Sequence, residues 1–244
     1  MFIGWVLWDA FGKRWLSDDA FISFRYAKNW SEGSGLVYNV GEYVEGYTNL
    51  LWTVVLGLGM LVGVQPEFLS HTLSIGALAI MLLVLTRFAS KSGWSLAVWV
   101  LGAMFHVRIF ATSGLETQWF LTTISVVMLG LWESRWRLVI IAMVLGLLIR
   151  PEGGLLWVAL SASVLIAQQK RVGLQILLSG LATIVGLEIW RFTYYGDWLP
   201  NTFHAKASES QWSQGWLYIR LFFQMYWFVP LGWFTAVSQL RHSE

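Results

Sequence analysis

The sequence predicts an all-α protein, a bundle of helices that crosses a lipid bilayer several times. Of its 244 residues, 57% are hydrophobic and only 12% are charged, whereas an ordinary soluble domain carries about 25% charged residues. The mean hydropathy is +0.59. The chain also holds 17 Trp, a residue that concentrates where a membrane meets water. We therefore expect a polytopic integral membrane protein that has the lipid bilayer as a partner.

Charge and cysteine content exclude several other classes. A formal net charge of +2 provides no dense basic face, so no nucleic-acid partner is expected. Because the chain has no Cys, a disulfide framework, a thiolate metal site and a thiol nucleophile are all excluded.

The chain begins with a short apolar element and then a charged one. Residues 1–8 (MFIGWVLW) are too few for a span, and they lack the basic start and the cleavage site of a signal peptide. Asp18 and Asp19 then precede an apolar stripe at helical spacing, with Arg25 and Lys28 off that stripe. The pattern predicts an amphipathic helix that begins at the two Asp residues.

Eight apolar stretches follow, each a candidate helix. Several are shorter than the roughly 20 residues that a perpendicular span needs. They lie at about 48–64, 67–86, 94–112, 117–132, 136–149, 153–167, 172–194 and 214–238.

The connections between these stretches differ in charge, and the difference predicts their sides of the membrane. Alternate connections carry seven basic residues and only two acidic ones, Glu133 and Glu244, which marks the cytoplasmic side. The other connections read SGLET (113–117), RPEGG (150–154) and YYGDWLPNTFHAK (194–206), and they are expected to face outward. The seven basic residues are Arg87, Lys91, Arg135, Arg137, Lys170, Arg171 and Arg241.

The stretch 48–64 decides which side the Asp pair faces. A full span would place SDDAF on the cytoplasmic side, whereas a helix that dips into the membrane and returns would place all four motifs outside. Gly57, Gly59 and Gly63 weaken a long straight helix, and Pro66 follows soon after. We therefore expect a dip, with residues 1–66 as an outward-facing motif loop and residues 67–240 as the transmembrane bundle.

Two acidic sites have a structural and a functional interpretation. Ser17 or Asp18 could cap the helix that follows, but capping explains one carboxylate and not two, and adjacent acids can also supply a base or hold a divalent cation. Glu116 opens the stretch 117–132, where the helix dipole alone favours a carboxylate.

Three further sites combine polar and aromatic or basic residues. GEYVEGYTN (41–49) brings Glu45, Tyr47 and Asn49 to the membrane boundary, either as a plain turn or as a binding surface. The loop 194–206 joins Asn201, His204 and Lys206 to aromatic rings, as a sugar or lipid-phosphate pocket would require. RPEGG can be a tight reversal with Pro at a helix start, or its Arg150 can bind a phosphate through a planar donor fork.

Arginines near the ends of apolar stretches have a simpler interpretation. Arg108, Arg191 and Arg220 are expected to extend their charged groups to the membrane interface.

Five motifs in order resemble a known enzyme family. DDAFISFRYAKN, GSGLVYNVGEYVEGYTNLLW, SGLETQWF, IRPEGG and YYGDWLPNTFHAK, spread over residues 18–206, are similar to those of GT-C glycosyltransferases, including the mycobacterial terminal arabinofuranosyltransferase group. The resemblance implies a GT-C-like bundle with membrane-surface helices at 19–32 and 48–64 in the first outward loop. Only Met1 to Leu16 precede the DD motif, and many members continue further than Glu244, so we expect a partial or shortened member.

The resemblance also implies a reaction. A sugar on a polyprenyl phosphate would pass, with inversion, to a glycan, lipid or protein hydroxyl at the outer face of the cytoplasmic membrane. Asp18 would be the base, and Asp19 and Glu116 could orient the acceptor or hold Mg²⁺ or Mn²⁺. The expected catalytic residues are Asp18 and Asp19, and the expected substrate-binding residues are Arg25, Glu45, Tyr47, Asn49, Glu116, Arg150, Glu152, Asn201, His204 and Lys206.

Two other functions remain open at this point. A transporter or flippase subunit would line a path with charges in the middle of several spans, whereas most charges here lie at the ends of the stretches. An inactive chain that binds the lipid-linked sugar without turnover is the other alternative.

Overall fold

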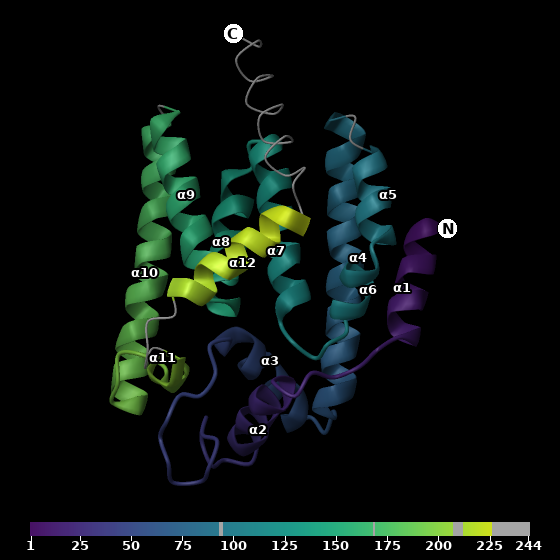
Figure 1. Cartoon of the computed structure of the whole chain (residues 1–244). Coiled ribbons are helices and arrows are strands. Elements are labelled where there is room, and N and C mark those ends of the chain that lie inside the picture. Colours follow the sequence, from purple (N-terminus) through teal and green to yellow (C-terminus); the bar gives the residue numbers. More distant parts are fainter. Residues whose placement is uncertain (93–94, 168, 207–211, 226–244) are drawn as a thin grey trace. The chain divides into compact units, whose positions relative to one another are not determined.

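A computed structural model describes residues 1–92, 95–167, 169–206 and 212–225 of the chain, and all regular structure in these ranges is helical (Figure 1). The all-α class is confirmed. The chain divides into two compact units, Met1–Thr202 and Phe203–Glu244. The helices are α1 (Phe2–Gly12), α2 (Ala20–Ser31), α3 (Leu50–Leu61), α4 (Pro66–Ser92), α5 (Ser95–Ala103), α6 (Phe105–Phe110), α7 (Thr117–Trp132), α8 (Trp136–Ile149), α9 (Gly153–Ile166), α10 (Lys170–Tyr195), α11 (Asn201–Lys206) and α12 (Trp212–Met225).

Most of the predicted helices form where the apolar stretches lie. The stretches 117–132 and 136–149 coincide with α7 and α8, and those at 48–64, 67–86, 153–167 and 172–194 correspond to α3, α4, α9 and α10. Helix α12 covers the first part of the stretch 214–238, and residues 226–238 lie outside the described residues.

The prediction of one helix at 94–112 is wrong, because the chain breaks into α5 and α6. Met104 between them is extended (φ −60°, ψ 125°). Arg108 of α6 explains the break: it donates to the carbonyl of Ala103 at the end of α5 (3.1 Å) and to Asp9 of α1 (2.6 Å). The guanidinium thereby caps α5 and ties α6 to α1.

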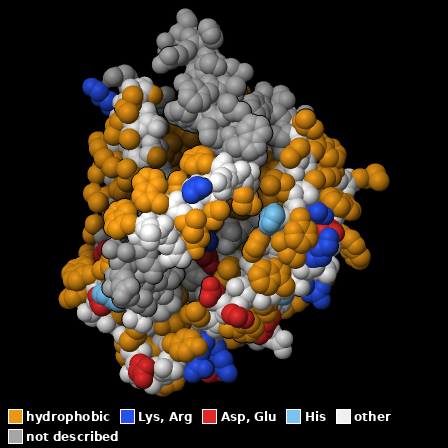
Figure 2. Space-filling view, in the orientation of Figure 1, with side chains coloured by type: hydrophobic (Ala, Val, Ile, Leu, Met, Phe, Trp, Pro, Cys, Tyr) orange, Lys and Arg blue, Asp and Glu red, His pale blue; other side chains and the backbone are white. Residues whose placement is uncertain are grey.

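Within the described ranges, two helices are long and apolar enough to cross a membrane. They are Pro66–Ser90 within α4 and Lys170–Tyr195, the whole of α10, with 25 and 26 residues. Helices α7, α8 and α9 have 16, 14 and 14 residues, or about 21–24 Å, against a hydrocarbon core of about 30 Å. Hydrophobic side chains are spread over much of the face seen in Figure 2, and Leu155 and Ile166 on α9 are among the exposed ones, as a helical membrane protein requires.

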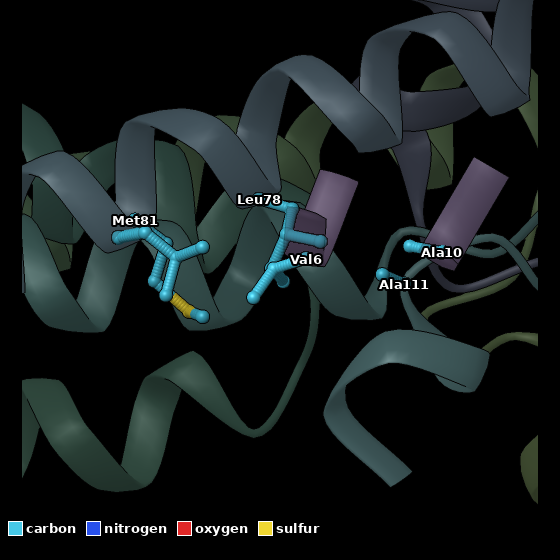
Figure 3. Packing of buried hydrophobic residues seen from close by; sticks show 6 residues of the cluster. Val6, Ala10, Leu78, Met81 and Ala111 are labelled. Carbon is cyan, nitrogen blue, oxygen red and sulfur yellow. The ribbon is translucent and has the colours of Figure 1, made fainter. Parts of the chain in front are cut away.

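Four hydrophobic clusters are found among the described residues of the first unit, and two of them join its long helices. Val6 and Ala10 of α1 pack against α4 and the residue that follows α6 (Figure 3). The second cluster joins α8, α9 and α10, where Trp157 donates to the carbonyl of Ile176 at 2.9 Å.

Helix α7 connects two charged ends of this unit. Glu133, the residue that directly follows its C-terminal end, pairs with Arg87 of α4 (2.8 Å) and with Arg135 (3.0 Å). Glu116 lies at the other end, a helix of 16 residues away. In Figure 1 the C-terminal ends of α4 and α9 lie at the upper end of the first unit, whereas α2 and α3 lie at its lower end. The basic connections and the motif segments are therefore separated along the helix axes.

Candidate active site

Asn49 is the centre of a buried polar network that joins three of the predicted motifs. It caps the start of α3 and is 7% exposed. Its amide nitrogen donates to Glu116 Oε2 (2.7 Å) and to Ser23 Oγ (3.0 Å), and its amide oxygen accepts from Thr53 Oγ1 (3.0 Å). GYTN, SGLET and α2 thus meet at one point.

Glu116 is a buried carboxylate between two donors. It precedes the first turn of α7 and is 6% exposed. One oxygen accepts from Asn49, and the other lies 3.6 Å from Nε of Arg150. A buried charge is costly unless it is paired and hydrogen-bonded, and the α7 dipole adds to both contacts.

Arg150 lies at the end of α8 with its guanidinium partly exposed. Residues before proline are driven into extended conformations, and Arg150 adopts φ −148°, ψ 139° before Pro151. Nη1 donates to Thr117 Oγ1 (3.1 Å), while Nη2 and Nε donate to the two oxygens of Glu152 (3.1 and 3.3 Å). The side chain of Arg150 is 30% exposed and that of Glu152 is 55% exposed. The donor fork is thus held from inside by Glu116 and Thr117, with Glu152 on the solvent side.

The Asp pair is exposed at the start of α2, next to SGLET. Asp19 makes no side-chain capping hydrogen bond, and the carbonyls of Ser17 and Asp18 accept from the first backbone N–H groups instead. The N–H of Ser17 donates to the carbonyl of Ser113 (2.9 Å). Gly114, at φ +82°, lies so close that a Cβ there would be 2.8 Å from the Ala20 Cβ. The structure thus places Asp19, and not Ser17 or Asp18 as expected, at the N-cap position without a capping hydrogen bond from its side chain, and both carboxylates face solvent beside the segment that carries Glu116.

Glu45 belongs to a second polar cluster, formed with the end of α10. Glu45 is 4% exposed, and its carboxylate accepts a hydrogen bond from Nε of Arg191 at 2.5 Å. Its backbone carbonyl accepts from the N–H of Asn201 at 2.8 Å. Arg191 also pairs with Glu188. Burial raises the pKa of the Glu45 carboxyl, and the hydrogen bond from Arg191 opposes that change. Glu45 and Asn201 hold the loop to α10, while their predicted substrate-binding role stays a prediction.

Tyrosine hydroxyls fix the same loop on either side of Glu45. The Tyr26 hydroxyl donates to the carbonyl of Val44 and accepts from the N–H of Gly46, both at 2.7 Å. The hydroxyl of Tyr47 lies 3.1 Å from that of Tyr195. Burial raises the pKa of Tyr47, so its hydroxyl stays protonated.

The remaining predicted residues lie apart from the Asn49 network. Arg25 is exposed, and it donates to the carbonyl of Tyr38 at 2.7 Å and stacks on its ring. His204 and Lys206 belong to the second unit, so their predicted role stays a prediction.

Several members of these clusters escaped the sequence analysis. Ser23, Thr53 and Thr117 are single hydroxyl residues on helices, which carry no signal of their own. The expectation that Arg108 and Arg191 reach the membrane interface is wrong, since both are largely buried and paired with acids. Glu188, three residues before Arg191 in an otherwise apolar stretch, could have indicated that Arg191 is paired with an acid.

The described residues do not fit a metal site. In the described ranges no group of three or more His, Cys, Asp or Glu side chains is arranged to hold an ion. Glu116 is also engaged by an amide N–H and a guanidinium, which are donors rather than fellow ligands. The metal role predicted for Asp19 and Glu116 therefore gains no support from the geometry.

An apolar groove adjoins the polar network. It has a volume of about 370 Å³ and lies between α3, α4, α7 and α8. Trp52 and Trp119 line it, as does Ile149, the residue before Arg150. The indole N–H of Trp52 donates to the carbonyl of Gly114 (3.2 Å), so the groove reaches the segment that carries Glu116.

Comparison with known proteins gives two informative relatives. The chain is 32% identical to a terminal β-(1→2)-arabinofuranosyltransferase of Mycobacterium tuberculosis, over 98% of this chain and 43% of the relative. It is 32% identical to a protein of the same name from Corynebacterium glutamicum, over 89% of this chain and 37% of the relative. The chain thus spans about two fifths of the length of these relatives.

Two further comparisons gave no match. No family model matches the chain. No solved structure matches it significantly. The two relatives therefore agree with the motifs from DDAFISF to YYGDWLPNTFHAK: over most of its own length the chain is similar to terminal arabinofuranosyltransferases.

Proposed function

We propose that the chain is a GT-C type membrane glycosyltransferase that moves a sugar from a polyprenyl-phosphate donor to a hydroxyl of a glycan or lipid. The observation that carries the proposal is the convergence of Asn49, Glu116 and Arg150, with the exposed Asp pair adjoining, at one end of an apolar groove. The names of the two relatives favour a pentose, an arabinofuranosyl group, as the transferred sugar.

Arg150 is the proposed phosphate ligand. Its Nε and Nη2 form a planar fork, the arrangement that binds phosphate through two parallel hydrogen bonds. In the structure this edge is occupied by the exposed carboxylate of Glu152. A phosphate oxygen pair would replace Glu152 at the same edge, while Thr117 keeps its hydrogen bond to Nη1 and Glu116 stays close to Nε.

The apolar groove is the proposed site for the first isoprenoid units of the donor. Trp52, Trp119 and Ile149 place its apolar wall next to the phosphate ligand. A single-chain lipid with a phosphate head requires this combination, since its tail must stay out of water while its head needs a charged partner. The proposal thus assigns the head and tail of one substrate to adjoining parts of the first unit.

Asp18 is the proposed general base. The hydroxyl oxygen of the acceptor attacks the anomeric carbon and gives its proton to the Asp18 carboxylate. The bond between that carbon and the phosphate oxygen breaks, and the lipid phosphate leaves with the electron pair. Arg150 stabilises the charge that develops on the leaving phosphate, and attack from the opposite face inverts the anomeric configuration. Asp19 orients the acceptor, and no step requires a metal.

The proposed location is the cytoplasmic membrane, with several spans and the motif segments facing outward. It is supported by the two candidate spans and by the separation of Glu116 and Glu133 along α7. The middle parts of both candidate spans, residues 68–86 and 172–187, contain no charged residue, which disfavours a transporter with a charged path.

The first test uses Arg150→Lys. Lysine keeps the charge but offers a point donor in place of a fork, so the affinity for polyprenyl phosphate should fall about tenfold or more. Tryptophan fluorescence of the 244-residue chain in detergent can report binding, because Trp52 and Trp119 line the groove. Arg137→Lys, at an exposed position on the basic side, is the matched control and should leave the affinity unchanged. Equal affinities for wild type and Arg150→Lys would contradict the proposed phosphate site.

A further inference from the structure

Ser23, Asn49 and Thr53 form a buried hydrogen-bonded group next to the Glu116 carboxylate. Ser23 of α2 is 3% exposed, Thr53 of α3 is 0% exposed and Asn49 is 7% exposed. Oε2 of Glu116 contacts this group through Asn49, whereas Oε1 is the oxygen near Arg150. We propose that Ser23, Asn49 and Thr53 are positioning residues, which fix the Glu116 carboxylate and through it set the orientation in which Arg150 grips the donor phosphate. This inference rests on the proposed function.

The orientation of the Asn49 amide follows from its partners. A carboxylate only accepts hydrogen bonds, so the amide nitrogen must face Glu116, 2.7 Å away. The amide oxygen then faces Thr53, whose hydroxyl donates to it at 3.0 Å. The Ser23 hydroxyl lies within 3.1 Å of both amide atoms and can donate to the oxygen while accepting from the nitrogen. The Glu116 carboxylate therefore decides which way the amide points, and the Thr53 hydroxyl holds the amide there by donating to its oxygen.

The fixed amide determines which oxygen of Glu116 is available to Arg150. Asn49 holds Oε2, which leaves Oε1 at 3.6 Å from Nε of Arg150. Thr117, the next residue, accepts from Nη1 of the same guanidinium at 3.1 Å. A carboxylate near Nε and a hydroxyl at Nη1, both from one short segment, thus position the guanidinium, and rotation of the carboxylate would change its orientation.

Burial supports a positioning role over the substrate contact predicted from the sequence for Asn49. With at most 7% exposure, Ser23, Asn49 and Thr53 present almost no surface to a ligand. Their hydrogen bonds join α2, α3 and the start of α7, elements that carry three separate motifs. A change in this network should therefore reach the phosphate through Arg150.

A double-mutant cycle tests the coupling. Polyprenyl phosphate is titrated into the full chain in detergent, for wild type, Thr53→Val, Arg150→Lys and the double variant. Valine matches threonine in shape but removes the hydroxyl, and loss of one hydrogen bond should weaken binding about three- to tenfold. If Thr53 acts through Arg150, the double variant should bind no more weakly than Arg150→Lys alone, since residues in one network are not additive.

Two further variants separate positioning from general damage. Thr53→Ser restores the hydroxyl and should bind within about twofold of wild type, the spread expected of a conservative change. Thr86→Val, on α4 near the basic end, removes a hydroxyl that donates to the carbonyl of Leu82, and it should leave the affinity unchanged. Thermal unfolding of each variant identifies any that fails to fold, and Ser23→Ala replaces Thr53→Val in the cycle in that event.

The outcomes are distinct. Equal weakening by Thr53→Val in the wild-type and Arg150→Lys backgrounds would overturn the inference and leave the phosphate site intact. No effect of Arg150→Lys would overturn the proposed function and the inference with it. Non-additive weakening, with recovery in Thr53→Ser, would support both.

Discussion

Two acidic sites in the first unit have opposite surroundings, and this difference separates their proposed roles. Glu116 is buried and held by Asn49 and Arg150, so it can supply a fixed negative charge but cannot reach a substrate hydroxyl. Asp18 is exposed at the start of α2, where an acceptor can approach. A mobile, hydrated carboxylate suits proton transfer, and a fixed one suits electrostatic support.

Asp18→Asn tests the base assignment. The amide keeps the size of the side chain but cannot take the proton, so turnover should fall about 100-fold or more, the scale of general-base catalysis. Binding of polyprenyl phosphate should persist, because Arg150 and the groove are unchanged. The measurement is sugar transfer from a polyprenyl-phosphate sugar in liposomes; Asp19→Asn is measured alongside and should lose less turnover, because Asp19 orients the acceptor and takes no proton. A loss in Asp19→Asn alone would move the base by one residue, and full activity of both variants would remove the main support for the enzyme.

At the scale of single residues, the sequence indicates which positions carry charge but not how they are joined. Asp18, Asn49, Glu116 and Arg150 stand out because polar residues interrupt apolar stretches. Thr53 does not stand out, because its hydroxyl meets the Asn49 amide only once α3 has formed. That amide in turn contacts both α2 and the start of α7. The contact between Glu45 and Arg191 spans 146 residues, and no local pattern encodes such a distance.

The bounds of some helices follow from neighbouring residues, whereas others involve contacts between residues far apart in the sequence. The bounds of α7 and α8 follow from charged and turn-forming residues at both ends, and these signals are local. The break at Met104 lies inside a continuous apolar stretch, where it depends on Arg108 reaching Asp9 of α1. Helix α3 has 12 residues, about 18 Å, but α8 and α9 are also shorter than the hydrocarbon core, so the dip stays a prediction.

Helix α10 offers a test of packing at the element scale. A Cβ at Gly180 would meet the ring of Trp157 on α9, the ring whose N–H donates to Ile176. Gly180→Ala should therefore separate α9 from α10 and cost about 1–3 kcal/mol, the usual range for overpacking. Unfolding of the detergent-solubilised protein, followed by tryptophan fluorescence, gives the change.

Gly186 on the same helix provides the matched control. A Cβ there has no atom within 4 Å, and alanine is the better helix former. Gly186→Ala should therefore leave stability unchanged or raise it slightly. Equal destabilisation by both substitutions would mean that the α9–α10 contact does not depend on the space at Gly180.

For the first unit as a whole, the separation of its two ends is the main feature. At one end Glu133 forms ion pairs with Arg87 and Arg135. These two arginines belong to connections that the sequence predicts on the same, basic side. At the other end the Asn49 network joins segments that are far apart in the sequence. The sequence predicted which connections lie at the same end, because consecutive spanning helices run in opposite directions and alternate connections therefore share a side. It could not establish whether α3 crosses the membrane.

Cysteine labelling tests the sidedness, because the chain has no native Cys. Single substitutions are made at the exposed positions Glu32 and Thr48 and the partly exposed Gly154 at the motif end, and at the exposed Ser90 and Ser134 at the basic end. An impermeant thiol reagent applied to intact cells should label residues 32, 48 and 154 only, and residues 90 and 134 should react only after permeabilisation. If α3 crossed the membrane, residues 32 and 48 would join 90 and 134 on the inside while 154 stayed outside. The exposed Asp18 would then be separated from Arg150 by the bilayer, and the proposed transfer could not take place.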